Sequence, residues 1–267
     1  MNKLNLSRTK ITIAISALLL IILVVWGMFT PDGLMGKADA IGYAVCHRIA
    51  IRSFHLGERP LPLCARCSGM YLGAVTGILY QMIRFTRRGG LPNLKTGWPF
   101  LFFAAAWVFD GVNSYLHFFP GVNGLYEPTN TLRLITGLGM GLSISAILVP
   151  SFNQSVWDAF DPRPVFIHWR SYLELVGITA LVGLLFYSQN TIILYPLALI
   201  SAGGVLLVLG MAYCILWLMV WKKENSCVSW KWVALPFLGG LVTAFAQIIA
   251  FDAVRYWLTG TWDGFHL

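Results

Sequence analysis

Charged side chains are scarce in this sequence of 267 residues. Only 11% of the residues are Asp, Glu, Lys or Arg, whereas 57% are hydrophobic. This scarcity excludes a water-soluble globular protein, whose surface needs far more charge. It also excludes a disordered chain, which is poor in apolar residues. The composition instead predicts a protein that lies largely within a lipid bilayer.

Seven apolar segments reach about 20 residues, the length at which an α-helix crosses a bilayer. The longest stretch outside them, residues 30–64, is too short for a soluble domain. We therefore predict an all-α fold: a polytopic transmembrane helix bundle of about seven spans, forming one integral membrane domain over residues 1–267. Within it, the Cys/His loop 30–64 precedes a helical bundle at 65–257. The predicted spans are 10–29, 65–84, 99–119, 131–150, 171–188, 192–220 and 233–257.

Basic residues lie mostly on one side of these spans. If the N-terminus is cytoplasmic, twelve of the 19 Lys and Arg residues lie on the cytoplasmic side, as the positive-inside rule requires. We therefore predict a multi-pass protein of the cytoplasmic membrane with its C-terminus outside. Topology accounts for the net charge of +8, so the lipid bilayer is the expected partner and no nucleic acid is. The twelve are Lys3, Arg8, Lys10, Arg84, Arg87, Arg88, Lys95, Arg163, Arg170, Lys222, Lys223 and Lys231.

Three cysteines and a histidine gather in the outer loop and at the start of the second predicted span. Cys46 and His47 are adjacent, and Cys64 and Cys67 are three residues apart. Thiolate and imidazole are typical zinc ligands, and the Cys-x-x-Cys spacing is that of half a zinc site. Because adjacent residues ligate one ion only with an awkward backbone, His55 in the same loop is an alternative fourth ligand.

The same spacing also suits thiol chemistry. Cys64 and Cys67 at the start of a helix resemble a redox pair, with Cys46 as a third thiol and a membrane quinone as the electron acceptor. A structural disulfide is a further alternative, because the outer face of a membrane is usually oxidising. A structural disulfide would leave one thiol over, which favours a metal site, or a catalytic thiol pair with a partner thiol, over a static bridge.

Polar residues within the predicted spans converge on the outer face. Asp110 and Asn113 share one helical face, and Arg133 begins the next span. Polar residues in a bilayer are costly and are usually functional. We therefore predict a polar cavity beside the metal site, with these three as candidate catalytic residues and with Asp110 or Asp252 paired to Arg133, or Asp252 to Arg255. Its other predicted members are Arg48, Arg66, His117, Asn130, Asp252 and Arg255.

Three blocks of the sequence resemble a family of predicted prokaryotic multi-span membrane proteins classed as a domain of unknown function. The resemblance covers about residues 40–145 and implies a multi-span membrane protein without assigning an activity, substrate or cofactor. The blocks are Cys46-His47-Arg48 with Leu61-Pro62-Leu63-Cys64-Ala65-Arg66-Cys67, then Asp110-Gly111-x-Asn113, and then Asn130-Thr131-x-Arg133.

These observations support several functions. The leading hypothesis is an outer-face zinc site beside a polar cavity. With an open metal position and Asp110 as base, the protein would be a hydrolase or transferase acting on a small molecule or a lipid. With four protein ligands, the metal would be a structural clip. The alternatives are a thiol-disulfide/quinone oxidoreductase and a transporter that uses Asp110 and Arg133. The sequence leaves open whether the protein is an enzyme.

Overall fold

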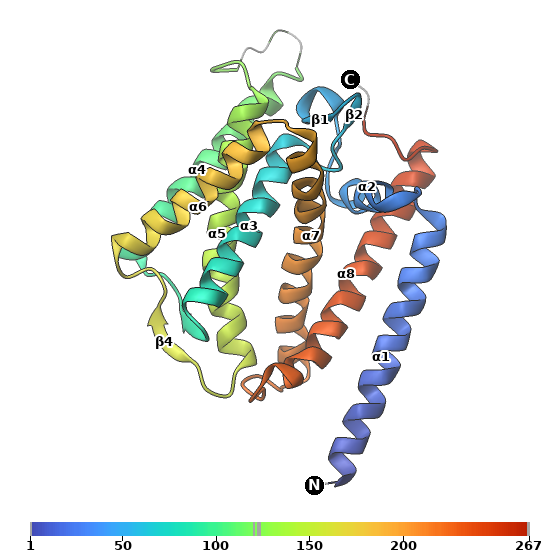
Figure 1. Cartoon of the computed structure of the whole chain (residues 1–267), viewed down its shortest axis with the longest axis vertical. Helices are drawn as coiled ribbons and strands as arrows, with labels where there is room; N and C mark the ends of the chain where they lie inside the picture. Colours follow the sequence, from blue (N-terminus) through green and yellow to red (C-terminus); the bar gives the residue numbers. More distant parts are fainter. Residues whose placement is uncertain (1, 120, 122–123, 266–267) are drawn as a thin grey trace.

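The computed structural model is a bundle of long α-helices (Figure 1). It describes residues 2–119, 121 and 124–265, with side chains from residue 9 onward. The bundle's helices pack mostly side by side, and the shorter α2 lies across one end of it. The eight α-helices of the described residues are α1 (Asn2–Phe29), α2 (Gly33–Val45), α3 (Ala65–Arg84), α4 (Leu94–Leu116), α5 (Asn130–Val156), α6 (Trp169–Tyr187), α7 (Thr191–Val220) and α8 (Trp230–Thr259).

Short strands lie at the two ends of the bundle. β1 (His55–Leu56) pairs antiparallel with β2 (Arg59–Pro60), in the loop that follows α2. At the opposite end, β3 (Arg88–Gly90) pairs parallel with β4 (Asp161–Pro164) (Figure 1). A single 3-10 turn, η1 (Ala50–Arg52), precedes β1. The predicted all-α class is therefore confirmed, since these strands are only two to four residues long.

Each of the seven predicted spans falls on one helix. Five of these helices are long and apolar enough to cross a membrane: α1 from Thr9, α5, α6, α7 and α8. α3 and α4 have a sufficient length of 20 and 23 residues, but they carry more polar side chains. The bundle is thus established, whereas seven spans and the predicted orientation stay predictions. The region predicted as a loop, 30–64, contains α2 and lies over the end of the bundle (Figure 1).

α3 and α5 pack backbone against backbone. Gly69 and Gly73 of α3 lie so close to α5 that an added Cβ would overlap its carbonyl oxygens. Gly137 and Gly141 of α5 meet the carbonyl oxygens of α3 in the same way. Small residues at four-residue spacing allow such close approach between membrane helices. The contact fixes how α3 is rotated, and therefore where the side chains of its first turn point.

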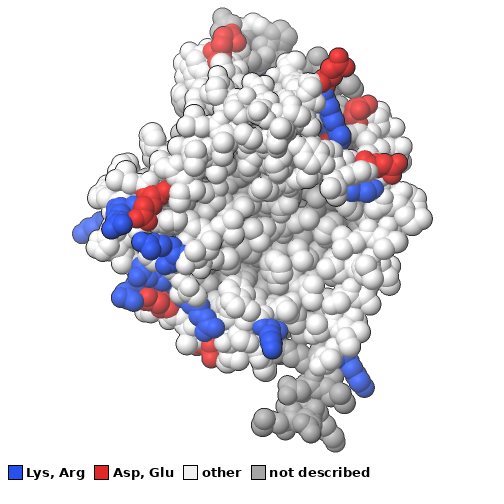
Figure 2. Space-filling model, in the orientation of Figure 1, with Lys and Arg blue, Asp and Glu red and all other residues white. Residues whose placement is uncertain are grey.

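Charged side chains are confined to the two ends of the visible surface. Figure 2 shows a broad band without charge between them, which is the surface expected where a protein contacts lipid hydrocarbon. Large apolar side chains are exposed along the helices, including Leu20 on α1, Leu173 on α6 and Phe251 on α8. The chain starts at one end of the bundle, and its C-terminus reaches the end that holds α2, β1 and β2 (Figure 1).

Candidate functional site

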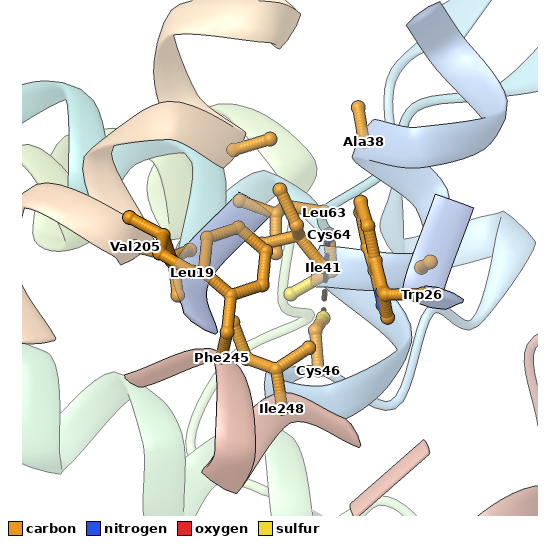
Figure 3. Close-up of a cluster of buried hydrophobic side chains, with 12 residues drawn as sticks. Leu19, Trp26, Ala38, Ile41, Cys46, Leu63, Cys64, Val205, Phe245 and Ile248 are labelled. Carbon is orange, nitrogen blue, oxygen red and sulfur yellow. Dashed lines mark hydrogen bonds between the residues drawn. The ribbon is translucent and has the colours of Figure 1, made fainter. Parts of the chain in front are cut away.

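Cys46 and Cys64 meet at the end of the bundle covered by α2. Cys46 directly follows α2, and its extended backbone turns the chain away from the helix. Cys64 is the N-cap residue directly before α3, and its backbone N–H donates to Cys46 Sγ at 3.4 Å. The N–H of Arg48 also donates to this sulfur, at 3.5 Å. Figure 3 shows the two sulfurs facing each other among apolar side chains.

Three side chains form a group with the spacing of metal ligands. The ligand atoms of Cys46, His47 and Cys64 all lie within 4.8 Å of one another, and Cys46 Sγ is 3.9 Å from His47 Nδ1. Around one zinc ion, Zn–S bonds of about 2.3 Å and Zn–N bonds of about 2.0–2.1 Å require separations of this order. All three cysteines of the predicted cluster are free thiols. The adjacent pair Cys46 and His47 thus reaches one point in space, although the sequence made this arrangement look awkward.

Cys67 and His55 lie differently. The Cys67 thiol hydrogen-bonds to the thiols of Cys46 and Cys64 but is outside the ligand group that includes His47. His55 begins β1, where it pairs with Pro60, and it does not belong to the group either. Of the predicted ligands, the structure therefore assembles Cys46, His47 and Cys64, with Cys67 as a neighbouring thiol.

The surroundings of the group separate the pKa values of its thiols. Hydrogen bonds from the thiols of Cys64 and Cys67 hold the pKa of Cys46 well below its usual value. The hydrogen bond to Cys46, together with burial, raises the pKa of Cys64 to about 11. Burial lowers the pKa of His47, which keeps its imidazole neutral. A thiolate and a neutral imidazole are the protonation states that bind metal ions.

Two arginines hold the backbone around this group. Arg255 of α8 donates to the carbonyl oxygens of Tyr43 at 2.7 Å, Cys46 at 2.6 Å and His47 at 3.2 Å, and its guanidinium stacks 3.9 Å from the Tyr43 ring. Arg48, in the left-handed backbone region at φ 53°, forms an ion pair with Asp39 at 2.8 Å. Both arginines therefore stabilise the backbone of the ligand loop, the segment 45–64 that carries Cys46, His47 and Cys64.

The hydrogen bond of Asp252 goes to α1 and not to another predicted cavity residue. Asp252 is buried, and one of its carboxylate oxygens accepts a hydrogen bond from Trp26 Nε1 at 3.3 Å. This contact joins α8 to α1. Among the described residues, Asp252 forms no ion pair with Arg133 or Arg255, contrary to the predicted pairing, because the Arg255 side chain turns to the carbonyl oxygens near Cys46.

Asp110 is the centre of a buried network at the same end of the bundle. Arg66 of α3 donates to it, with Nε 3.0 Å from Oδ2, and also donates to Ser114 Oγ at 2.9 Å. The Tyr126 hydroxyl donates to the other carboxylate oxygen, Oδ1, at 2.9 Å. The Thr136 hydroxyl donates to Oδ2 at 3.4 Å. The partner of Asp110 is thus Arg66, whereas the sequence predicted that Arg133 pairs with either Asp110 or Asp252.

Tyr126 was not among the predicted site residues. It lies between α4 and α5, where no periodic pattern marks it. Burial and its hydrogen bond to Asp110 raise the pKa of Tyr126 to about 12, so its hydroxyl stays a donor. Asn113 holds this loop, because its side chain donates to the Tyr126 carbonyl at 2.8 Å and accepts from the Leu125 N–H at 2.6 Å. His117 Nδ1 lies 2.8 Å from the Asn113 carbonyl.

Arg133 is buried without an acidic partner. Its Nη1 donates to Asn130 at 2.9 Å, and Asn130 in turn donates to the Ile51 carbonyl at 3.2 Å. Within the part of the chain that the structure describes, no carboxylate forms an ion pair with Arg133, and its Nε has no hydrogen-bond partner. Its charge is therefore uncompensated by direct contact.

A pocket of about 390 Å³ adjoins the metal-ligand group. His47 belongs to both, and the guanidinium groups of Arg52 and Arg66 also line the pocket. Arg52 donates to the Ser114 carbonyl at 3.3 Å and stacks 3.8 Å from the Phe118 ring. Arg52 was not predicted as a site residue. The remaining lining residues are Ile49, Gly111, Tyr115, Phe118 and Phe265.

Comparison with known proteins agrees with this description. A family profile described as "Predicted membrane protein (DUF2085)" matches residues 46–147. An uncharacterized protein of Methanothermobacter thermautotrophicus is 31% identical over 106 residues, which are 39% of this chain and 83% of that protein. The chain belongs to this family of predicted membrane proteins. An uncharacterized protein of Methanocaldococcus jannaschii is 29% identical over 122 residues, 45% of this chain and 72% of that protein. No solved structure matches.

The segment matched by the family profile contains every predicted metal ligand together with α3, α4 and most of α5. It also contains Arg52, Asp110 and Arg133. Outside it lie Arg255, which holds the backbone around Cys46, and the helices α1, α2, α6, α7 and α8. The ligand group and the pocket are therefore built mainly by the part of the chain that defines the family.

The ion pair between Arg66 and Asp110 predicts a large effect of neutralising Asp110. The substitution Asp110→Asn leaves the Arg66 guanidinium without its counter-charge and is expected to lower the free energy of unfolding by about 3 kcal/mol. Asp161→Asn is the control: this carboxylate pairs with the exposed Arg163 and with Arg88 at the surface of the opposite end, so its neutralisation is expected to change the free energy of unfolding much less. Thermal unfolding in detergent measures both variants. Equal melting temperatures for the two would contradict the assigned role of Asp110.

Proposed function

We propose that this protein holds a zinc ion at the outer end of its helix bundle, with Cys46, His47 and Cys64 as ligands. The observation that carries the proposal is the convergence of these three ligand atoms within 4.8 Å of one another. Cys46 and Cys64 lie among apolar side chains (Figure 3), where unpaired polar groups are costly. Ligation of a metal ion satisfies both sulfurs at once.

The donor set favours zinc over other common metals. Mixed thiolate and imidazole ligands suit Zn²⁺, whereas Ca²⁺ and Mg²⁺ take oxygen ligands. Two thiolates also neutralise the two charges of the ion, so a Cys–His–Cys centre adds no net charge to a buried position. Oxygen donors are lacking at this point, because Asp39 is engaged by Arg48 and Arg59, and Asp110 by Arg66.

The position of His47 suggests that the centre is open to the pocket. Three protein ligands leave one tetrahedral position, which is the arrangement of catalytic rather than structural zinc sites. A zinc ion with an open position activates bound water, which supplies chemistry for hydrolysis or group transfer. The substrate would be a small molecule or a lipid that enters the pocket lined by His47 and Arg52. If Cys67 completes the coordination, the zinc is instead a structural clip for the ligand loop.

The network around Asp110 suggests a role different from that of a general base. Its carboxylate already accepts hydrogen bonds from Arg66, Tyr126 and Thr136. We therefore assign Asp110 as a positioning residue, which holds the Arg66 guanidinium at the wall of the pocket. Asn113 contributes to the same network by holding the Tyr126 backbone. Arg133 adds positive charge near Arg66 and Asp110.

A second function is favoured by the third thiol. The Cys67 thiol acts on the pKa values of both Cys46 and Cys64, so it is a neighbour of the two thiols that lie within 4.8 Å of each other. Oxidation of two thiols to a disulfide releases two electrons and two protons, which a membrane quinone would take up to become a quinol. This thiol-disulfide/quinone oxidoreductase is the alternative to the zinc centre.

We further infer seven spans, with the N-terminus in the cytoplasm and the ligand group outside. α3 supports this inference because it packs among α5, α6 and α7, three helices that are long and apolar enough to cross the membrane. Most of the positive charge in Figure 2 lies at the end opposite to the ligand group, as a cytoplasmic location of that end requires.

Metal analysis tests the proposed centre. Purified protein is expected to contain about one equivalent of zinc, which Cys64→Ser removes because a hydroxyl is a poor zinc ligand. Cys214→Ser is the matched control, since Cys214 is a buried thiol of α7 in another part of the core, and it should retain the metal. Retention by Cys67→Ser supports the open position. Metal-free wild-type protein whose thiols cycle between reduced and disulfide forms would replace the zinc centre with the oxidoreductase.

Labelling of introduced cysteines tests the orientation. Glu58 and Ser226 are exposed at opposite ends of the bundle, whereas four native cysteines are buried and Cys67 is half-buried. In intact cells a membrane-impermeant maleimide is expected to label Glu58→Cys above the wild-type background, and to label Ser226→Cys only after permeabilisation. The reverse pattern would place the ligand group in the cytoplasm.

A further inference from the structure

Three arginines at or near the pocket carry more positive charge than the described residues neutralise: Arg52 and Arg66 line the pocket, and Arg133 lies close to them without lining it. Arg52, Arg66 and Arg133 lie close enough to act on one another electrostatically. Among the residues that the structure describes, Asp110 is the only acidic side chain that forms an ion pair with any of the three. Two positive charges are therefore left over at a site that is largely withdrawn from water.

This excess of charge is costly to the protein alone. Arg52 is only 9% exposed, and burial together with the charges of Arg133 and Arg66 lowers its pKa. Arg133 is 6% exposed, and its Nε has no hydrogen-bond partner among the described residues. Buried cations of this kind normally have an anion beside them. The proposed zinc centre does not supply one, because its two thiolates are matched by the charge of the ion.

The donors of Arg52 are available to such an anion. A guanidinium has five N–H groups, and the structure gives Arg52 one hydrogen bond, to the Ser114 carbonyl. Its face is fixed by the Phe118 ring, so the orientation of the remaining N–H groups is set in advance. Arg66 is likewise held by Asp110 and Ser114. Rigid arginine pairs are well suited to bidentate binding of oxyanions.

We propose that this pocket binds the phosphate group of a partly apolar molecule, with Arg52 and Arg66 as the donors to the phosphate oxygens. A phosphate monoester carries a charge of about −1.5 to −2 at neutral pH, which matches the two uncompensated charges, whereas a single carboxylate matches one. The volume of about 390 Å³ leaves room beyond the phosphate, and Tyr115, Phe118 and Phe265 offer aromatic surface to the rest of the molecule. This inference goes beyond the metal centre and does not depend on it.

Phosphate-dependent thermal stabilisation of the detergent-solubilised protein tests the proposal with inorganic phosphate as the probe. A ligand that binds the folded state raises the melting temperature by mass action. Arg52→Gln is expected to weaken the apparent phosphate affinity by about tenfold or more, the effect of losing one charge-assisted contact. Arg59→Gln is the control, because Arg59 lies in the same loop, pairs with Asp39 and does not line the pocket. It should leave the affinity unchanged.

A second pair of variants leaves both arginines intact. Gly111 lines the pocket, and a Cβ atom added there meets no atom within 4 Å. Gly111→Glu places a carboxylate of the protein beside the arginines and is expected to abolish the phosphate effect. Gly111→Gln, which has the same size without the charge, should retain most of it. If Arg52→Gln fails to fold, this pair decides alone: equal phosphate binding by both Gly111 variants would overturn the proposal.

Native mass spectrometry with added phosphatidic acid distinguishes a lipid headgroup from a water-soluble phosphate. Wild-type protein that retains this lipid, while Gly111→Glu does not, supports a lipid as the bound molecule. Stabilisation by inorganic phosphate without selective lipid retention supports a soluble phosphate ester. The proposal is overturned if the wild type responds to neither probe, or if Arg52→Gln and Arg59→Gln behave alike in both assays.

Discussion

The close contact between α3 and α5 is the constraint on which the site depends. Because glycines let the two backbones touch, α3 has only one rotation that fits. That rotation directs Cys64 and Cys67 toward Cys46 at the end of α2, and Arg66 toward Asp110 of α4. The first turn of α3 thus contributes residues both to the thiol cluster and to the pocket lined by Arg52 and Arg66. One packing contact therefore positions both sets of side chains.

Four arginines gather at this end of the bundle, and they differ in what compensates their charge. Arg255 is satisfied by backbone carbonyls and thereby holds the ligand loop, whereas Arg66 is satisfied by a carboxylate and holds the pocket wall. Arg52 and Arg133 are not matched by any carboxylate of the described chain. The structure therefore separates the charges that stabilise the fold from those left available for an anion. The proposed metal centre and the proposed phosphate site share one wall, formed by His47.

Much of this arrangement could be predicted from the sequence, because it follows from local patterns. Runs of apolar residues marked all seven bundle helices, and the clustering of Cys46, His47 and Cys64 within one short segment indicated their meeting. The predicted ion-pair partner of Asp110 was wrong, because pairing between helices depends on the rotation of α3. The periodicity of a single helix carries no information about that rotation. Asp252 was placed with the cavity by depth alone, whereas it contacts Trp26 of α1. Tyr126 and Arg52 were missed because they lie outside the long helices, where periodicity gives no signal.

The proposed zinc ion has Cys46, His47 and Cys64 as ligands and one position open toward the pocket lined by Arg52 and Arg66. X-ray absorption at the zinc edge of the purified protein tests it most directly, because it counts the sulfur neighbours of the metal. We expect two sulfurs at about 2.3 Å, with the remaining neighbours nitrogen or oxygen at about 2.0–2.1 Å. Three sulfurs would place Cys67 in the coordination shell and close the site. A zinc signal without sulfur neighbours would contradict the centre altogether.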